Sequence, residues 1–372
     1  MKTQGRNWLL LGGELSGYTF DLFETIASLG GIDIRILYNP LDGLPSFQHE
    51  RSGGRASNRW WWKDTGWSQM REYIRTPAPD ADFLYGNRPR VKMNLALAMI
   101  PSATPVFYAA DTNIIKLVGR PGITLGRRLA CAPIAARATA ALSLGLTNRL
   151  ALQALGFRRT VDVPAYAVDF AALDATATEV EAHALGTHDD EIVVLIIARL
   201  TPVKNLPGVI AAVAKEPDLA RGIRLVIAGE GPDRGALEQI QRSSPGLKLD
   251  LLGPIPRQGI GTLFRRADAL LIPSLADAWG IVVVEALGMG IPVVATPTVG
   301  AAVSLAGYTG AILLSDSTEP CSVTAALRRF VAQRTQLTTA ARECVPYIRA
   351  QYDRIAVAEK TVRLVYGDRC SL

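Results

Sequence analysis

The fold is decided by one stretch, residues 269–296, which reads ALLIPSLADAWGIVVVEALGMGIPVVAT. Its two ends are short apolar runs typical of buried parallel strands, and the residues between them are enough for a connecting helix. Two carboxylates, Asp277 and Glu285, stand eight residues apart around the expected helix start. Open α/β sheets bind ligands at the carboxyl ends of strands, so we expect both acids to face one crevice there. The N–H groups of the helix start favour a phosphate at the same place.

Two further segments put polar residues at the same sheet edge. The apolar run Ile192–Ala198 is followed at once by Arg199 and Lys204, a pair of cations suited to a diphosphate. The run Ile223–Ala228 ends in the turn Gly229–Pro232, where glycine lets the backbone approach a ligand closely. The sequence therefore predicts a phosphate-binding edge built from three successive strand ends.

Together these segments resemble the retaining glycosyltransferases of family 4, also called glycosyltransferase group 1. The matching patterns are R-x4-K at Arg199–Lys204, the G-E-G-P turn at Gly229–Pro232, and E-x7-E at Asp277–Glu285, in the family's order. The first acid is Asp277 where the family usually has Glu. The resemblance covers the second half in detail and the first half in outline. It implies an α/β chain of GT-B architecture, with two Rossmann-like doubly wound domains facing a central cleft.

The resemblance also implies roles for residues of the second half. Arg199 and Lys204 would hold the diphosphate, Glu285 the ribose, and Asp277 the hydroxyls of the transferred sugar. The alternatives from the sequence are surface charge for the two cations, an exposed helix acid for Glu285, and a helix cap for Asp277. The donor, a UDP- or GDP-sugar, would contact a set of residues at the strand ends: Gly229, Gly231, Gly253, Pro254, Ile255, Ala278, Trp279, Gly280, Ile281 and Val282. No cofactor is implied beyond this co-substrate.

The first half carries weaker signals. Residues 12–17 resemble the glycine loop that approaches the donor from the first domain, with Gly13 as its contact. Asp111 stands where family members often have a His; it faces the acceptor or caps the next helix. The string Asp80-Ala81-Asp82 leads into an apolar strand away from the phosphate loop, so we interpret it as a strand start and predict no metal site.

The order of apolar runs predicts two doubly wound domains. The domains are expected at residues 1–166 and 191–346, with a linker at 167–190 and a helix at 347–372 that returns to the first domain. The predicted strands are residues 8–11, 32–38, 82–85, 105–108, 141–146 and 161–164 in the first half, and 191–198, 224–228, 249–252, 269–272, 292–295 and 311–314 in the second.

One stretch, residues 41–70, does not fit this alternation and is expected to be a long loop. It holds Trp60, Trp61, Trp62 and Trp67 beside cations. Packing of these indoles onto the first domain is the favoured interpretation; contact with a lipid interface or stacking on a sugar are the alternatives.

The net charge of +6 is unevenly distributed. Residues 1–165 hold 20 Lys and Arg against 12 Asp and Glu, and include Arg120, Arg127, Arg128 and Arg137. Such a face is either a solvated surface or a partner surface for a phosphorylated acceptor or an anionic membrane; without a nucleic-acid motif, no nucleic-acid partner is expected.

Four scattered cysteines and the lack of an apolar run of about 18 residues favour the cytoplasm, peripheral to the inner membrane face.

The function predicted from these features is that of a metal-independent retaining glycosyltransferase. It would move a sugar from a nucleotide-sugar donor to a glycan or lipid-linked acceptor, in bacterial cell-surface polysaccharide or glycolipid synthesis. The alternative is a non-catalytic GT-B subunit that binds a nucleotide sugar and supports a partner glycosyltransferase. A third hypothesis, a nucleotide-sugar epimerase, needs catalytic acids and a His that the sequence does not provide.

Overall fold

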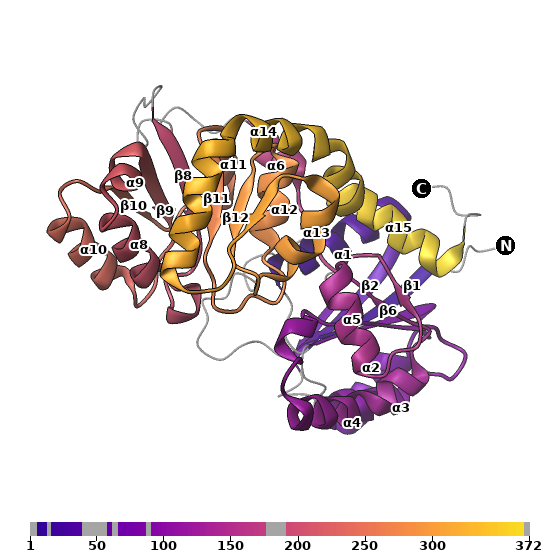
Figure 1. Ribbon diagram of the computed structural model, residues 1–372. Coiled ribbons are helices and arrows are strands. Elements are labelled where there is room, and N and C mark those ends of the chain that lie inside the picture. The colour runs from indigo at the N-terminus through magenta and orange to yellow at the C-terminus, as the bar shows by residue number, and fades with distance from the viewer. Residues whose placement is uncertain are drawn as a thin grey trace. The chain divides into compact units, whose positions relative to one another are not determined.

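The computed structural model describes residues 6–12, 16–38, 58–61, 66–86, 91–175 and 191–367. The chain divides into two compact units, residues 1–168 with 352–372, and residues 169–351. Figure 1 shows helices on the faces of a sheet in each unit. None of the helices within the described ranges is both long and apolar enough to cross a membrane.

The first unit is built on a parallel sheet of seven strands in the order β3-β2-β1-β4-β5-β6-β7. The strands are β1 (Arg6–Gly12), β2 (Ile32–Tyr38), β3 (Asn58–Trp61), β4 (Ala81–Tyr85), β5 (Val106–Ala109), β6 (Ala140–Leu142) and β7 (Thr160–Val161). The helices between them are α1 (Gly17–Gly30), α2 (Trp67–Arg75), α3 (Val91–Met99), η1 (Ile114–Lys116), α4 (Pro121–Arg137) and α5 (Leu146–Ala154). The six strands expected here are present, and β1, β4, β5 and β6 are apolar runs that the sheet largely or fully buries. The last two end earlier than predicted, β6 at Leu142 and β7 at Val161, and β7 is half-buried.

The expectation of a loop over residues 41–70 is wrong in part. Within it, β3 adds a seventh strand at the sheet edge, with Trp60 and Trp61 in register with Leu37 and Tyr38. Aromatic residues favour pleated strands, which explains why this short run pairs with β2. Trp67 opens α2 and is half exposed. Trp62 lies outside the described residues.

The second unit is built on a parallel sheet of six strands in the order β10-β9-β8-β11-β12-β13. The strands are β8 (Ile192–Ile197), β9 (Ile223–Ala228), β10 (Lys248–Gly253), β11 (Ala269–Ile272), β12 (Val293–Ala295) and β13 (Ile312–Leu314). Its helices are α6 (Phe170–Asp174), η2 (Pro202–Lys204), α8 (Leu206–Ala214), α9 (Pro217–Gly222), α10 (Arg234–Ser243), α11 (Arg257–Arg265), α12 (Ile281–Gly288), α13 (Gly300–Thr309) and α14 (Pro320–Tyr352). Every strand expected in this half is confirmed.

The C-terminal helix differs from the expected one, which began at residue 347. Residues 347–352 are instead the last turns of α14, and a separate helix, α15 (Arg354–Tyr366), begins after Asp353. Asp353 caps α15 by accepting the N–H groups of Ile355 and Ala356, so the break has a local cause in the sequence. The helix α15 packs on α1 of the first unit, and the Tyr366 hydroxyl accepts a 2.9 Å hydrogen bond from Trp8 Nε1.

The string Asp80-Ala81-Asp82 is a strand start, as the sequence indicated. Asp80 Oδ2 accepts the backbone N–H of Asn7 at 2.8 Å, and Asp82 is fully buried on β4. Burial raises the pKa of Asp82 well above its usual 3.8, against the opposing charges of Arg137 and Arg35. Arg35 is itself buried and donates to the carbonyls of Thr76 (3.0 Å) and Pro77 (2.5 Å). Asp82 is therefore an acid of the core.

This buried acid gives the protein a specific pH dependence. The pKa of Asp82 is raised in the native state, so its contribution to stability is complete below the unfolded value of 3.8 and is lost as pH rises through the native value. We expect Asp82→Asn to flatten the decline in the free energy of unfolding with pH, measured by urea denaturation from pH 4 to 8. Asp316→Asn, a change at a side chain 86% exposed, is the control, and equal slopes for Asp82→Asn and wild type would contradict the assignment.

Candidate functional site

The candidate residues of the second unit gather at the carboxyl edge of its sheet. Arg199 and Lys204 follow β8, and Asp277 and Glu285 follow β11. These two strands are neighbours, and the strand order reverses direction between them. Ligands of open α/β sheets bind at this switch point, outside the carboxyl ends of the strands. The topology thus brings together two segments more than seventy residues apart in sequence.

The loop after β8 has a defined shape. Arg199 is exposed, whereas Lys204 is half-buried at the end of η2. The next residue, Asn205, has φ 58°, and its side chain donates to the carbonyl of Thr318 at 2.9 Å. Asparagine tolerates this left-handed conformation better than most residues, so Asn205 turns the chain from η2 into α8 and fixes the position of Lys204.

The two predicted groups Lys204 and Asp277 contact each other directly. Lys204 Nζ lies 2.5 Å from Asp277 Oδ2, and both side chains are less than one-fifth exposed, at 19% and 18%. The backbone joins the same loops, since the N–H of Leu275 donates to the carbonyl of Val203 at 2.8 Å. The sequence assigned these residues to different parts of a donor and gave no signal of the pair.

Asp277 is not the N-cap residue of α12. The N-cap of α12 is Gly280, which has φ 82° and no side chain to accept a bond. A Cβ at Gly280 would lie 2.9 Å from Val299 Cγ1, so both the conformation and the space require glycine. The N–H of Ala301, in α13, donates to the carbonyl of Trp279 at 2.7 Å and so anchors the loop before α12.

Glu285 is a buried acid, and the alternative of an exposed helix acid is wrong. Its residue exposure is 3%, and its neighbours Val283, Val284 and Ala286 are fully buried. It lies in the second turn of α12, whose first N–H groups have no partner within the helix. Ala278, Ile281 and Val282 surround the same helix start and are half-buried.

The predicted base-pocket residues lie at the end of β10. Gly253 is buried with φ 74°, Pro254 is exposed and Ile255 is half-buried. The carbonyl of Gly253 accepts the N–H of Gly229 at 2.8 Å, which joins this strand end to the turn after β9.

In the first unit, Asp111 follows β5 at the carboxyl edge of the sheet and is half-buried. Its cap interpretation is wrong, because Asn113 caps η1 by accepting the N–H of Lys116 at 3.1 Å. Tyr85, at the end of β4, is close enough that the charge of Asp111 adds to burial in raising the tyrosine pKa.

Asn148 holds the Asp111 segment in place, and the sequence analysis missed it. It is fully buried on α5, and its Nδ2 donates to the carbonyls of Ala110 (2.8 Å) and Thr112 (2.6 Å), on either side of Asp111. Its Oδ1 accepts the N–H of Leu144 at 3.0 Å. A lone Asn near a helix start looks like a surface residue in sequence, so no signal distinguished it.

The glycine loop of the first unit is described only at its ends. Gly13 lies outside the described residues. Ser16 caps α1 by accepting the N–H of Thr19 at 3.2 Å, so the helix begins directly after the loop.

The chain is similar in sequence and fold to known proteins. Residues 178–345 match the family model described as Glycosyl transferases group 1. The D-inositol 3-phosphate glycosyltransferase of Mycobacterium tuberculosis is 36% identical over 138 residues, which are 35% of this chain and 28% of that protein. The chain thus matches well under a third of the length of this curated relative.

Solved structures share the whole fold. The Anabaena protein Alr3699/HepE in complex with UDP superposes with a TM-score of 0.75 at 16% identity, covering 97% of this chain and 99% of that one. Sucrose-phosphate synthase from Thermosynechococcus elongatus gives 0.68 at 15% identity, covering 97% and 98%. The expected GT-B architecture of two Rossmann-like doubly wound domains is therefore confirmed.

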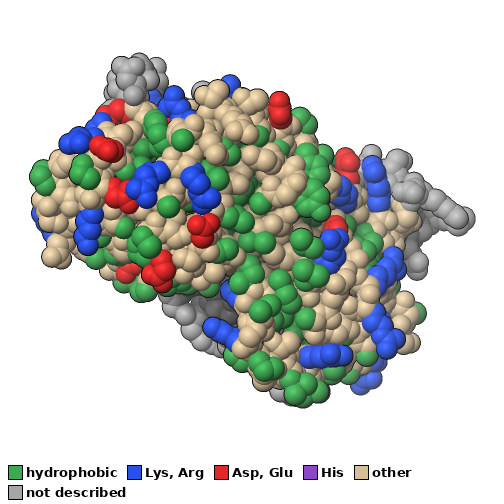
Figure 2. Space-filling model, in the orientation of Figure 1, with side chains coloured by type: hydrophobic (Ala, Val, Ile, Leu, Met, Phe, Trp, Pro, Cys, Tyr) green, Lys and Arg blue, Asp and Glu red, His purple; other side chains and the backbone are tan. Residues whose placement is uncertain are grey.

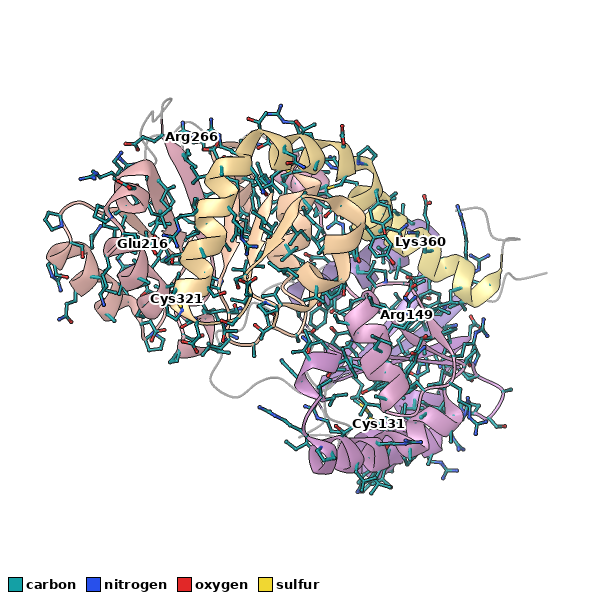
Figure 3. All side chains as sticks on the ribbon, viewed as in Figure 1. Cys131, Arg149, Glu216, Arg266, Cys321 and Lys360 are labelled. Carbon is teal, nitrogen blue, oxygen red and sulfur yellow. The ribbon has the colours of Figure 1, made fainter. Side chains whose placement is uncertain are left out.

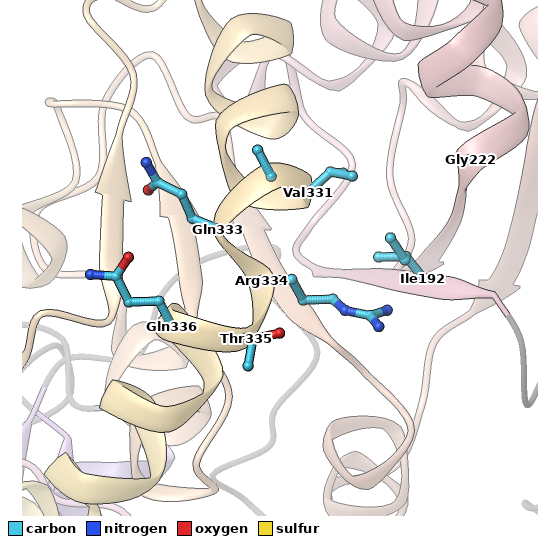
Figure 4. Close-up of a pocket in the computed structure, with 8 residues that line it drawn as sticks. Ile192, Gly222, Val331, Gln333, Arg334, Thr335 and Gln336 are labelled. Atoms are coloured by element: carbon cyan, nitrogen blue, oxygen red, sulfur yellow. The ribbon is translucent and has the colours of Figure 1, made fainter.

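One cavity of the second unit lies away from the loops after β8 and β11. Figure 4 shows this cavity of about 640 Å³, lined by Ile192, Gly222 and the segment of α14 around Arg334. Ile192 begins β8 and Gly222 precedes β9, so the cavity is at the amino edge of the sheet. Across the described ranges, no three His, Cys, Asp or Glu side chains cluster as a metal site.

The two glycines of the group 1 turn have a structural reason that the sequence analysis did not foresee. A Cβ on Gly229 would lie 1.8 Å from the carbonyl oxygen of Ala198, and one on Gly231 would lie 2.4 Å from that of Leu200. The N–H of Leu200 donates to the carbonyl of Glu230 at 2.9 Å. The glycines therefore let the turn after β9 pack its backbone against the loop that carries Arg199.

We expect Gly229→Ala and Gly231→Ala each to destabilise the second unit by more than about 1 kcal/mol, because the new methyl group collides with backbone at a φ above +140°. Gly235→Ala is the matched control: it lies in α10 with open space around it, and should be neutral or stabilising. Urea denaturation of the three variants measures the difference. A fully stable Gly229→Ala would show that the close approach does not exist in solution.

Proposed function

We propose that this protein is a metal-independent, retaining glycosyltransferase that uses a UDP- or GDP-sugar. Its acceptor is a glycan or a lipid-linked molecule, of the kind used to build bacterial surface polysaccharide or glycolipid. The proposal is supported by the group 1 match over residues 178–345 and by relatives and structural neighbours named as glycosyltransferases or as binding UDP.

The observation that carries the proposal is the contact between the two motif loops. A diphosphate at the switch point would meet Arg199 and Lys204 from one side and the start of α12 from the other. Asp277 already neutralises Lys204 there, at 2.5 Å. The site therefore combines cations, helix N–H groups and a carboxylate at the ends of two neighbouring strands, β8 and β11.

Each group then has a distinct task. Arg199 and Lys204 stabilise the negative charge that grows on the diphosphate as the sugar leaves. Glu285, buried within α12, accepts the ribose hydroxyls, because a buried carboxylate needs hydrogen-bond donors. Asp277 contacts the sugar and forms the ion pair that offsets the charge of Lys204. Asp111 faces the acceptor, in a position that Asn148 fixes.

Two protein cations and a helix start supply the positive charge that many transferases obtain from a divalent ion. We therefore expect transfer to continue in excess EDTA. The test is a screen of UDP- and GDP-sugars for thermal stabilisation of the protein, followed by turnover of each stabilising donor with and without chelator. Product anomeric configuration, read by NMR, tests retention.

The outcomes separate the hypotheses. A donor that stabilises the protein but is never cleaved, with any acceptor, supports the non-catalytic subunit instead. Activity that EDTA abolishes and Mg²⁺ or Mn²⁺ restores contradicts the assignment of the leaving-group charge to Arg199 and Lys204.

The Lys204–Asp277 pair predicts opposite effects from its two members. Lys204→Ala and Arg199→Ala should lower kcat/KM roughly 10²–10³-fold, because each removes a preorganised cation. Asp277→Asn should instead tighten binding of the free nucleoside diphosphate by about twofold to tenfold, because it removes the negative charge that neutralises Lys204. The same change should slow transfer, since the sugar loses a contact.

Calorimetry with the free diphosphate and with the intact donor measures both effects. Lys215→Ala and Asp218→Asn serve as controls, because both residues are exposed beyond the far end of α8. Weaker diphosphate binding in Asp277→Asn would show that the carboxylate holds the loop in place, and that its main effect is not to offset the charge of Lys204.

A further inference from the structure

The helix α4 presents an apolar face to solvent. Leu125 and Leu129 lie one turn apart and are 58% and 65% exposed, and Ile123 is 51% exposed. Ala132, Pro133 and Ala136 are exposed and continue the helix face of Leu125 and Leu129, whereas Ile123 is exposed in the first turn on another side of the helix. The opposite face packs inward through Cys131 and Ile134, which are buried; Figure 3 marks Cys131 on α4. The helix is thus apolar on both sides, although a surface helix normally exposes polar residues.

Neighbouring segments extend this face. Val118, just before α4, is 68% exposed, and Leu95 of α3 is 42% exposed. The helices α3 and α4 are in contact, and Asn94 Nδ2 lies 3.4 Å from the carbonyl of Ala130. We name the exposed apolar residues Leu95, Val118, Ile123, Leu125 and Leu129 the α4 face. Figure 2 shows hydrophobic side chains gathered at the lower end of the first unit, bordered by Lys and Arg.

The charges around the α4 face have one sign. Between residues 83 and 161 the sequence holds 11 Lys and Arg and a single acid, Asp111. Arg120 and Arg128 are exposed, and Lys116 and Arg127 are half-buried; within the described part of the chain none of these four has an ion-pair partner. Arg137 does not belong to this set, because it donates to the carbonyls of Pro101 (2.8 Å) and Thr104 (2.6 Å).

We propose that the α4 face docks this protein on an anionic lipid bilayer. The exposed aliphatic side chains lie on α4 and the segments next to it, and the cations beside them have no ion-pair partner among the described residues. An anionic bilayer matches both features, because it offers acyl chains to the aliphatic groups and anionic headgroups to the cations. A protein partner would need acidic groups opposite these cations and a shape complementary to a protruding helix. Val118 of the α4 face lies seven residues after Asp111 in sequence, so, if the proposed function holds, the acceptor end of β5 is near the lipid.

Flotation of the full chain with vesicles tests the docking without any substrate, so its result does not depend on transferase activity. We expect the protein to float with phosphatidylcholine vesicles containing one-third phosphatidylglycerol at low salt, and to float poorly with phosphatidylcholine alone or at high salt. L125S/L129S should reduce the bound fraction at limiting lipid by about tenfold or more. R120Q/R128Q should do the same for anionic vesicles.

Matched controls come from exposed residues elsewhere. Ile355→Ser changes an apolar residue that is 51% exposed on α15, and R71Q/R242Q removes two exposed arginines; both should float like wild type. Wild-type protein that stays unbound to anionic vesicles at low salt overturns the proposal. It is also overturned if sedimentation velocity finds a dimer that L125S/L129S dissociates while flotation stays unchanged, because the α4 face then joins two copies of the chain. The charge variant keeps the test valid if the leucine variant fails to fold.

Discussion

The second unit depends on the close approach of loop backbones at the carboxyl edge of its sheet. The carbonyl of Gly253 accepts from Gly229 N–H at 2.8 Å, Glu230 carbonyl accepts from Leu200 N–H at 2.9 Å, and Val203 carbonyl accepts from Leu275 N–H at 2.8 Å. These bonds join the loops after β10, β9, β8 and β11 into one layer. Only glycine at positions 229 and 231 leaves room for it. These backbone hydrogen bonds therefore fix the positions of the loops, and the loops in turn position the side chains of the candidate site.

Within this frame, the Lys204–Asp277 pair balances the charge. A half-buried cation without a partner is costly, and a carboxylate at 2.5 Å offsets that cost while no anion is bound. A bound diphosphate would compete for the same ammonium. The shorter Asp, where the family usually has Glu, suits this contact, because the pair forms across neighbouring strand ends that are already joined by backbone. The arrangement links Asp277, where the resembled family usually has Glu, to a contact that the structure contains.

The sequence predicted the second sheet well, because its central strands are apolar runs that parallel packing buries, most completely in β11 and β12. It predicted the positions of Arg199, Lys204 and Glu285 at one sheet edge for the same reason. It missed β3, a short strand in which Trp60 and Trp61 follow a polar stretch. This strand forms by pairing with β2, and its own sequence is not an apolar run. It also missed the Lys204–Asp277 pair and the role of Asn148. Those contacts join residues 73 and more than 30 positions apart, and local patterns carry no information about them.

The two units differ in how their cations are paired, and this difference supports the proposed docking surface over a merely solvated basic face. In the second unit, cations are mostly matched: Arg224 pairs with Glu191 and Asp250, Arg234 with Glu230 and Glu238, and Arg349 with Asp174. A chain that was merely rich in arginine would show the same matching throughout. Around α4 there are instead no acids in sequence from residue 112 to 161, and the exposed cations border exposed aliphatic side chains. Charge and apolar area are concentrated on the same helix, which is the pattern of a surface made for an anionic, apolar partner rather than for solvent.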